Sequence, residues 1–106
     1  MKPVYVHGVG AITAFGRTWA ESLPRLAAGD SAVRPVETFD VARFPCGVAA
    51  AIPYPIAHTE DRRLRLAESA AMEAWAMAGL EAPPEAIGVF VGAESGRATL
   101  ATIQAV

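Results

Sequence analysis

Apolar residues form two short runs near opposite ends of the chain, and glycine follows each run. The first, V-Y-V-H at 4–7, precedes Gly8 and Gly10, and the second, I-G-V-F-V at 87–91, precedes Gly92. Runs of β-branched and aromatic residues that end in glycine predict strands that lead into turns. The second run is apolar throughout, which is typical of a strand covered on both faces, as in parallel sheets.

Two segments between these runs have helical patterns. Thr18 and Glu21 stand at capping-box spacing and predict a helix over 19–28 that a glycine ends. The longer segment opens with T-E-D at 59–61, where a threonine cap and two carboxylates complement the helix dipole. Its apolar residues recur at helical spacing as far as Gly79, so it predicts the clearest helix in the chain.

The region between these helices is irregular, and its prolines limit any strand to short pieces at 33–36 and 47–52. Strand, helix, helix and strand in this order predict an α/β fold. Residues 98–106 resemble the opening of a further helix and have no stop signal, so we expect a truncated chain.

Composition restricts the class of protein. The 106 residues are 53% hydrophobic and 19% charged, which suits one domain that buries roughly two-thirds of its unfolded surface. A net charge of −2 argues against nucleic acid as a partner. No apolar run approaches the roughly 20 residues of a membrane span, so we expect no membrane association. A single cysteine, Cys46, allows no intrachain disulfide and fits a cytoplasmic location.

The glycine-containing loop at 8–16 raises the hypothesis of a dinucleotide site. The fingerprint G-x-G-x-x-G matches at Gly8 and Gly10, but Thr13 stands where the third glycine belongs. The predicted helix also begins only after Gly16, too late to direct its N-terminus at a pyrophosphate. We therefore favour a structural turn.

Few residues offer reactive chemistry. Cys46 has only His7 and His58 available to activate it, and a lone cysteine is most often a small buried apolar residue. Two histidines without matching carboxylates predict no metal site. Glu94, in the loop that follows the second apolar run, cannot define a reaction alone, although α/β folds bind ligands at such strand ends.

Arginines crowd the start of the longer predicted helix at Arg62, Arg63 and Arg65. One interpretation is a solvated helix face, in which Arg65 pairs with Glu68 or Ser69. The other is a small basic patch for an acidic partner. The spacing alone favours the solvated face.

Five segments, in this order, resemble the β-ketoacyl-acyl-carrier-protein synthases, a family of thiolase-fold condensing enzymes. They are V-Y-V-H-G-V-G-A-I-T-A-F-G at 4–16, L-A-A-G-D-S-A-V-R-P-V at 26–36, F-D and R-F-P within 39–45, D-R at 61–62 with the alanine-rich helix to A-G-L at 78–80, and I-G-V-F-V-G at 87–92. The resemblance covers almost the whole chain and rests on the collinear order rather than on any one motif.

The resemblance implies that residues 1–106 are the amino-terminal part of a single thiolase-like domain, with a parallel-containing mixed sheet and flanking helices. It implies an acyltransferase that performs a decarboxylative Claisen condensation in fatty acid or polyketide synthesis, without a cofactor. Its partners would be an acyl carrier protein and a second synthase subunit, in a homodimer or heterodimer. In this chemistry a cysteine holds the acyl chain as a thioester and two histidines assist decarboxylation.

Cys46, His7 and His58 do not match the family's catalytic positions, so the resemblance transfers no catalytic residue and predicts no activity for these 106 residues alone. It does suggest two binding roles. Ser95, with its neighbours Glu94 and Gly96, corresponds to a loop that gates the acyl pocket. The arginines at 62, 63 and 65 lie near the positions where relatives dock the acidic carrier protein.

The sequence also departs from the family pattern. His7 replaces the usual threonine, Ala14 replaces the usual proline, and E-S-G-R at 94–97 replaces a more glycine-rich loop. These changes leave two alternatives open: a non-catalytic subunit that resembles a chain-length factor, or a truncated paralogue that acts as a protein-binding module.

Overall fold

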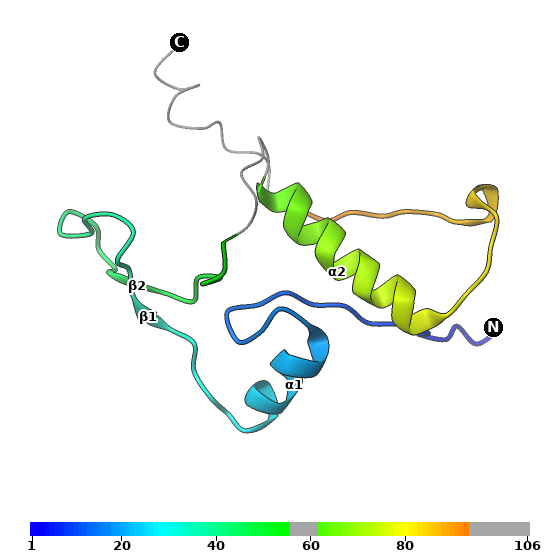
Figure 1. Ribbon diagram of the computed structural model, residues 1–106, viewed down its shortest axis with the longest axis horizontal. Coiled ribbons are helices and arrows are strands. Elements are labelled where there is room, and N and C mark those ends of the chain that lie inside the picture. The colour runs from blue at the N-terminus through cyan, green and yellow to red at the C-terminus, as the bar shows by residue number, and fades with distance from the viewer. Residues whose placement is uncertain (56–61, 94–106) are drawn as a thin grey trace, which may run out of the picture.

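A computed structural model describes residues 1–55 and 62–93. Figure 1 shows the long helix α2 between two extended segments, the amino-terminal one and the one that follows the short 3-10 helix η1. The elements are α1 (Trp19–Ala27), β1 (Arg34–Pro35), β2 (Val48–Ala49), α2 (Arg62–Ala78) and η1 (Pro84–Ala86). The predicted helices are therefore confirmed within these ranges, although the expected cap of the second, at 59–61, lies outside them.

Helix α1 begins where the sequence predicts, at a threonine cap. Thr18 has an extended backbone, and its hydroxyl accepts a hydrogen bond from the Glu21 N–H at 3.2 Å. In a capping box the carboxylate of Glu21 would accept from the N–H of the cap residue, Thr18. Here it accepts from the N–H of the preceding residue, Arg17, at 2.6 Å. Gly29, with φ of +76°, then ends the helix in the left-handed region, as predicted.

We expect the substitution Thr18→Ala to lower the free energy of unfolding of α1 by about 1 kcal/mol, because the helix would lose its capping oxygen. Far-UV circular dichroism during urea denaturation would measure the loss. Thr38→Ala is the matched control, because Thr38 is an exposed loop residue outside both strands. An equal effect of the two substitutions would contradict the capping role.

Strands β1 and β2 form a short antiparallel pair, with Arg34 opposite Ala49 and Pro35 opposite Val48. The Val36 N–H donates to the Gly47 carbonyl at 2.9 Å and extends the ladder by one bond. Both strands lie inside the ranges that the sequence predicts, and both are shorter. Proline supplies no amide proton to a ladder, which explains why the pairing stops so soon.

The expected strands at 4–7 and 87–91 are not strands in this structure. Both segments are extended, but neither pairs with another strand among residues 1–55 and 62–93. The prediction of a parallel-containing sheet therefore finds no support in that part of the chain, where the sheet is antiparallel. An apolar sequence favours extended backbone, but a strand also needs a neighbour to pair its N–H and C=O groups.

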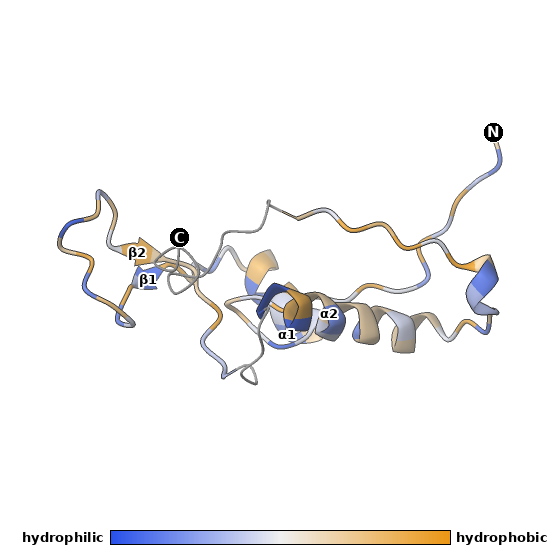
Figure 2. Cartoon of the chain, turned by 90° about the horizontal axis from the view of Figure 1, so that it is seen from above, coloured by the Kyte–Doolittle hydropathy of each residue, from blue (hydrophilic) through white to orange (hydrophobic). Residues whose placement is uncertain are grey.

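The described residues bury no hydrophobic side chain, and their one fully buried side chain is Ser22. Figure 2 shows apolar colour along the exposed extended segments as well as on the helices.

The loop at 8–16 lies in close backbone contact with α2. A Cβ atom on Gly10 would overlap the carbonyl oxygen of Ala70, and one on Gly8 would overlap that of Ala74. The loop backbone therefore rests directly on a helix face made of alanines. This contact, which spans about sixty residues of sequence, positions the polar cluster described below.

Candidate functional site

The polar cluster at the junction of the 8–16 loop, α1 and α2 centres on Glu73. The N–H of Trp19, the first residue of α1, donates to the two carboxylate oxygens at 2.6 and 3.0 Å. The Ala11 N–H donates to the same carboxylate at 3.3 Å. Glu73 thus satisfies a free amide at the positive end of α1 and fastens the loop to α2.

A second set of bonds shapes the loop itself around Thr13. Its hydroxyl lies 2.7 Å from the buried Ser22 hydroxyl and accepts from the Phe15 N–H at 3.1 Å. The Tyr54 hydroxyl donates to the Thr13 carbonyl at 3.2 Å. The Tyr54 bond holds the segment before α2 against the loop. The Thr13 hydroxyl gives the buried Ser22 hydroxyl a hydrogen-bond partner.

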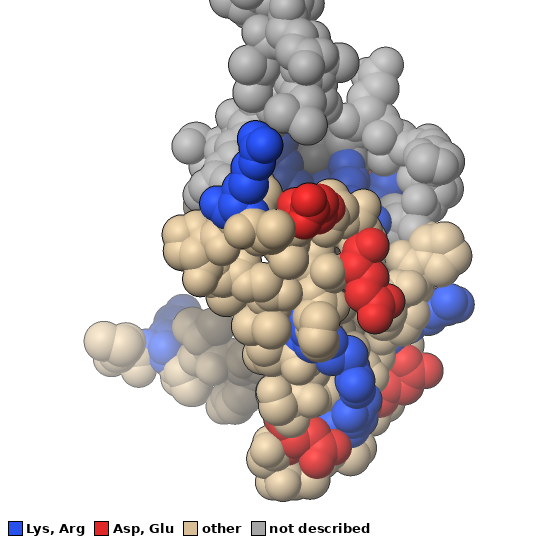
Figure 3. Space-filling model, turned by 90° about the vertical axis from the view of Figure 1, so that its left-hand side faces the viewer, with Lys and Arg blue, Asp and Glu red and all other residues tan. Residues whose placement is uncertain are grey.

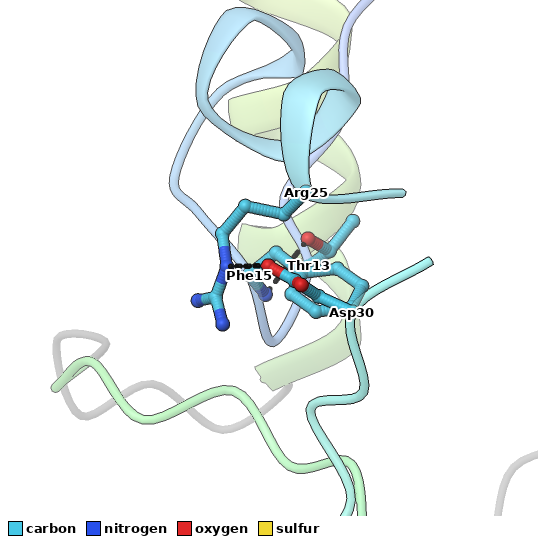
Figure 4. Close-up of polar contacts among 4 residues, drawn as sticks. All are labelled: Thr13, Phe15, Arg25 and Asp30. Atoms are coloured by element: carbon cyan, nitrogen blue, oxygen red, sulfur yellow. Dashed lines mark hydrogen bonds and ion pairs between the residues drawn. The ribbon is translucent and has the colours of Figure 1, made fainter. Parts of the chain in front are cut away.

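The carboxyl end of α1 is tied back to the same loop. Figure 4 shows the Arg25 side chain beside Phe15 and Asp30. The Arg25 guanidinium lies 4.9 Å from the centre of the Phe15 ring, and its Nε is 3.2 Å from an Asp30 oxygen. Both charged side chains are over 40% exposed, so this pair contributes at most about 1 kcal/mol.

An open groove of 570 Å³ lies between the 8–16 loop, the end of α1 and the segments at 30–33 and 50–52, and its lining is mainly apolar. The apolar side chains that line it include Ile12, Phe15, Leu26, Val33 and Ile52.

A second hollow of 730 Å³ shares part of that wall, including Ile52, and adds Arg34, Tyr54 and Arg62. Arg17 stacks on the Tyr54 ring at 4.8 Å. The two hollows together offer apolar surface and the positive charge of Arg34 and Arg62.

The groups with reactive chemistry lie apart from this groove. Cys46 is exposed, and its thiol donates to the Val48 carbonyl at 3.4 Å, while His7 is exposed in the amino-terminal segment. Within residues 1–55 and 62–93, no group of three or more His, Cys, Asp and Glu residues could hold a metal ion. His58 lies outside those ranges. Among the described residues, neither Cys46 nor His7 lines the groove.

The residues predicted for the acyl pocket, Glu94, Ser95 and Gly96, lie outside the described residues. The predicted docking arginines at 62, 63 and 65 are exposed at the start of α2. Arg62 donates to the Ile52 carbonyl at 3.4 Å, and Arg65 pairs with Glu68 at 2.9 Å. Of the two partners predicted for Arg65, the structure therefore shows Glu68. On the face shown in Figure 3, charges of both signs are interspersed.

Three residues that organise the junction were not predicted from the sequence, namely Ser22, Tyr54 and Glu73. A signal for Glu73 was present, because it is the one charged residue in the run S-A-A-M-E-A-W-A-M-A at 69–78. A charge on an otherwise apolar helix needs a partner when another segment covers it. Ser22 and Tyr54 carried no such signal.

Comparison with known proteins adds no relative from which a function could be taken. No family model, no curated protein and no solved structure matches this chain. In the described residues, no helix is long and apolar enough to cross a membrane. What the chain does must therefore be inferred from its own residues.

Proposed function

We propose that the chain is the amino-terminal part of a β-ketoacyl-acyl-carrier-protein synthase of thiolase-like fold. The supporting observation is the contact of Gly8 and Gly10 with Ala70 and Ala74. It brings together two of the five segments that resemble the family, the opening loop and the alanine-rich helix. A resemblance that reflects a shared fold requires distant segments of this kind to fit each other, and these segments do.

In this proposal the enzyme joins an acyl group to a malonyl unit held by an acyl carrier protein, with loss of carbon dioxide. The 106 residues contribute scaffold and binding surface to that reaction. The loop at Glu94–Gly96 would border the acyl pocket, and the arginines at 62, 63 and 65 would face the acidic carrier protein. Arg62 and Arg65 keep their charged groups exposed at the surface while they make their bonds within the chain.

We expect no β-ketoacyl product from the 106-residue chain with malonyl- and acyl-carrier protein, because Cys46 and His7 form no reactive pair. The protein translated from the complete reading frame that contains this sequence should release carbon dioxide and form that product. Mass spectrometry of the carrier-bound chains would detect the β-ketoacyl product in both reactions, the one with the 106-residue chain and the one with the complete protein. Product from the 106 residues alone would contradict the first expectation, and failure of the complete protein with every carrier partner would contradict the proposal.

A second candidate is a non-catalytic subunit that resembles a chain-length factor and pairs with an active synthase. The sequence E-S-G-R at 94–97, which replaces a glycine-rich loop, favours this alternative. In the same assay the complete protein would then be inactive alone. It would alter the length of the product when an active synthase subunit is added.

A further inference from the structure

The 730 Å³ hollow is lined by arginines from two separate segments of the chain. Arg34 belongs to β1, and Arg62 is the first residue of α2. Tyr54 also lines the hollow, and its ring carries the Arg17 guanidinium at 4.8 Å. Glu37 is the one acidic residue among the described residues of the lining. Positive charge therefore exceeds negative charge in this set, which favours a negatively charged ligand group.

Both arginines of the lining have donors that the chain itself does not use. The Arg34 side chain is exposed and makes no hydrogen bond or ion pair with residues 1–55 or 62–93. Arg62 donates from Nη2 to the Ile52 carbonyl at 3.4 Å. A guanidinium has five N–H donors in a planar fork that matches the two oxygens of a carboxylate. Arg34 and Arg62 can therefore still bind a carboxylate of another molecule.

Arg65, on the same helix as Arg62, has a different environment. Its Nη1 lies 2.9 Å from a Glu68 carboxylate oxygen, and it does not line the hollow. An arginine and a glutamate in contact have no net charge together, so they attract an approaching anion less than an unpaired arginine does. The field at this surface therefore comes more from Arg34 and Arg62 than from Arg65.

We propose that this hollow is the docking point for a carboxylate side chain of an acidic protein, which Arg34 and Arg62 bind and Arg65 does not. Sites for small molecules bury most of the ligand, whereas both arginines here are exposed, where a side chain on another protein's surface reaches them. Arg34 thus replaces Arg65 in the set of docking residues. The inference rests on the proposed function for the identity of the partner, the acidic carrier protein.

Fluorescence anisotropy tests the proposal with the protein translated from the complete reading frame and a labelled acyl carrier protein. We expect Arg34→Gln to raise the Kd about fivefold, mostly through slower association, because exposed charges at an interface act on the association rate. Arg62→Gln should act similarly, and Arg65→Gln should change the Kd less than about twofold. Arg43→Gln is the matched control, because Arg43 is exposed in the loop between β1 and β2 and does not line the hollow.

Glu37→Gln provides a test of opposite sign. It removes the acidic residue of the lining, so it should lower the Kd about threefold. A general loss of folding weakens binding and cannot produce this gain. Equal effects of Arg34→Gln and Arg43→Gln would overturn the proposal, and so would a larger effect of Arg65→Gln than of Arg34→Gln, or an unchanged Kd in Glu37→Gln.

A hexaglutamate peptide separates this inference from the proposed function. If the complete protein forms no β-ketoacyl product with any carrier, the proposed function fails, and NMR titration with the peptide at low ionic strength still tests the docking point. Peptide binding that Arg34→Gln weakens and Arg43→Gln does not would support it, whereas no binding, or binding that Arg34→Gln leaves unchanged, would overturn it. Product formation by Arg34→Gln with an unchanged KM for the carrier would overturn the docking point and leave the proposed function standing.

Discussion

Replacing Gly10 by alanine is expected to separate the 8–16 loop from α2, with a loss of about 2 kcal/mol in the free energy of unfolding. The added Cβ would overlap the Ala70 carbonyl oxygen and lie 2.9 Å from the Ala74 nitrogen. Both contacts are helix backbone, which cannot rotate away as a side chain can. Alanine also restricts the unfolded chain, but that gain is about 0.4–1 kcal/mol and does not offset the overlap.

Urea denaturation would measure the loss of stability. The NMR contact between the protons of residue 10 and those of Ala74, compared in the parent chain and the variant, would show whether the loop has separated from α2. Gly92→Ala is the matched control, because its new Cβ would meet nothing within 4 Å. Neither Gly10 nor Gly92 has a positive φ, so the two substitutions differ in space and not in backbone strain. Equal stability of the two variants would show that the loop does not rest on α2 in solution.

Replacing Glu73 by glutamine should cost about 2 kcal/mol, because hydrogen bonds to a charged group are worth about 1.5–3 kcal/mol. The carboxylate accepts from Trp19 and Ala11, and its negative charge also complements the positive end of α1. Glutamine keeps the size of the side chain but replaces one acceptor oxygen with a donor. Amide hydrogen exchange at Trp19 should therefore become faster.

Glu68→Gln is the matched control, because it removes one negative charge from α2 without touching the carboxylate that binds Trp19. Glu68 is on the same helix and pairs with Arg65 at the surface, where both side chains are about half exposed. An exposed pair of this kind contributes at most about 1 kcal/mol, and its loss should leave the exchange of Trp19 unchanged. If the two variants behaved alike, the capping of α1 by Glu73 would be wrong.

The local features of the fold could be predicted from the sequence. Thr18 and Gly29 delimit α1 because helix caps depend on residues within one turn of the helix end. The prolines around β1 and β2 likewise limit those strands through the chain's own geometry. These features need no information about distant contacts.

The remaining features depend on contacts that sequence patterns do not specify. Residues 4–7 and 87–91 have the composition of strands, but a strand forms only where a neighbour pairs with it. The binding of Glu73 to Trp19 joins positions 54 residues apart, and no local pattern connects them. The candidate acyl loop at Glu94–Gly96 stays a prediction, and so does the docking role of the arginines at 62, 63 and 65.

The bond between Glu73 and Trp19 also has a consequence for the order of events during synthesis. A ribosome adds roughly 5–20 residues per second, so the 54 residues between these partners take about 3–10 seconds to appear. Through that interval α1 has only its own Thr18 cap, and the 8–16 loop has no helix to rest on. The nascent chain therefore holds the 8–16 loop for seconds before α2, the helix on which the loop rests, has been synthesised.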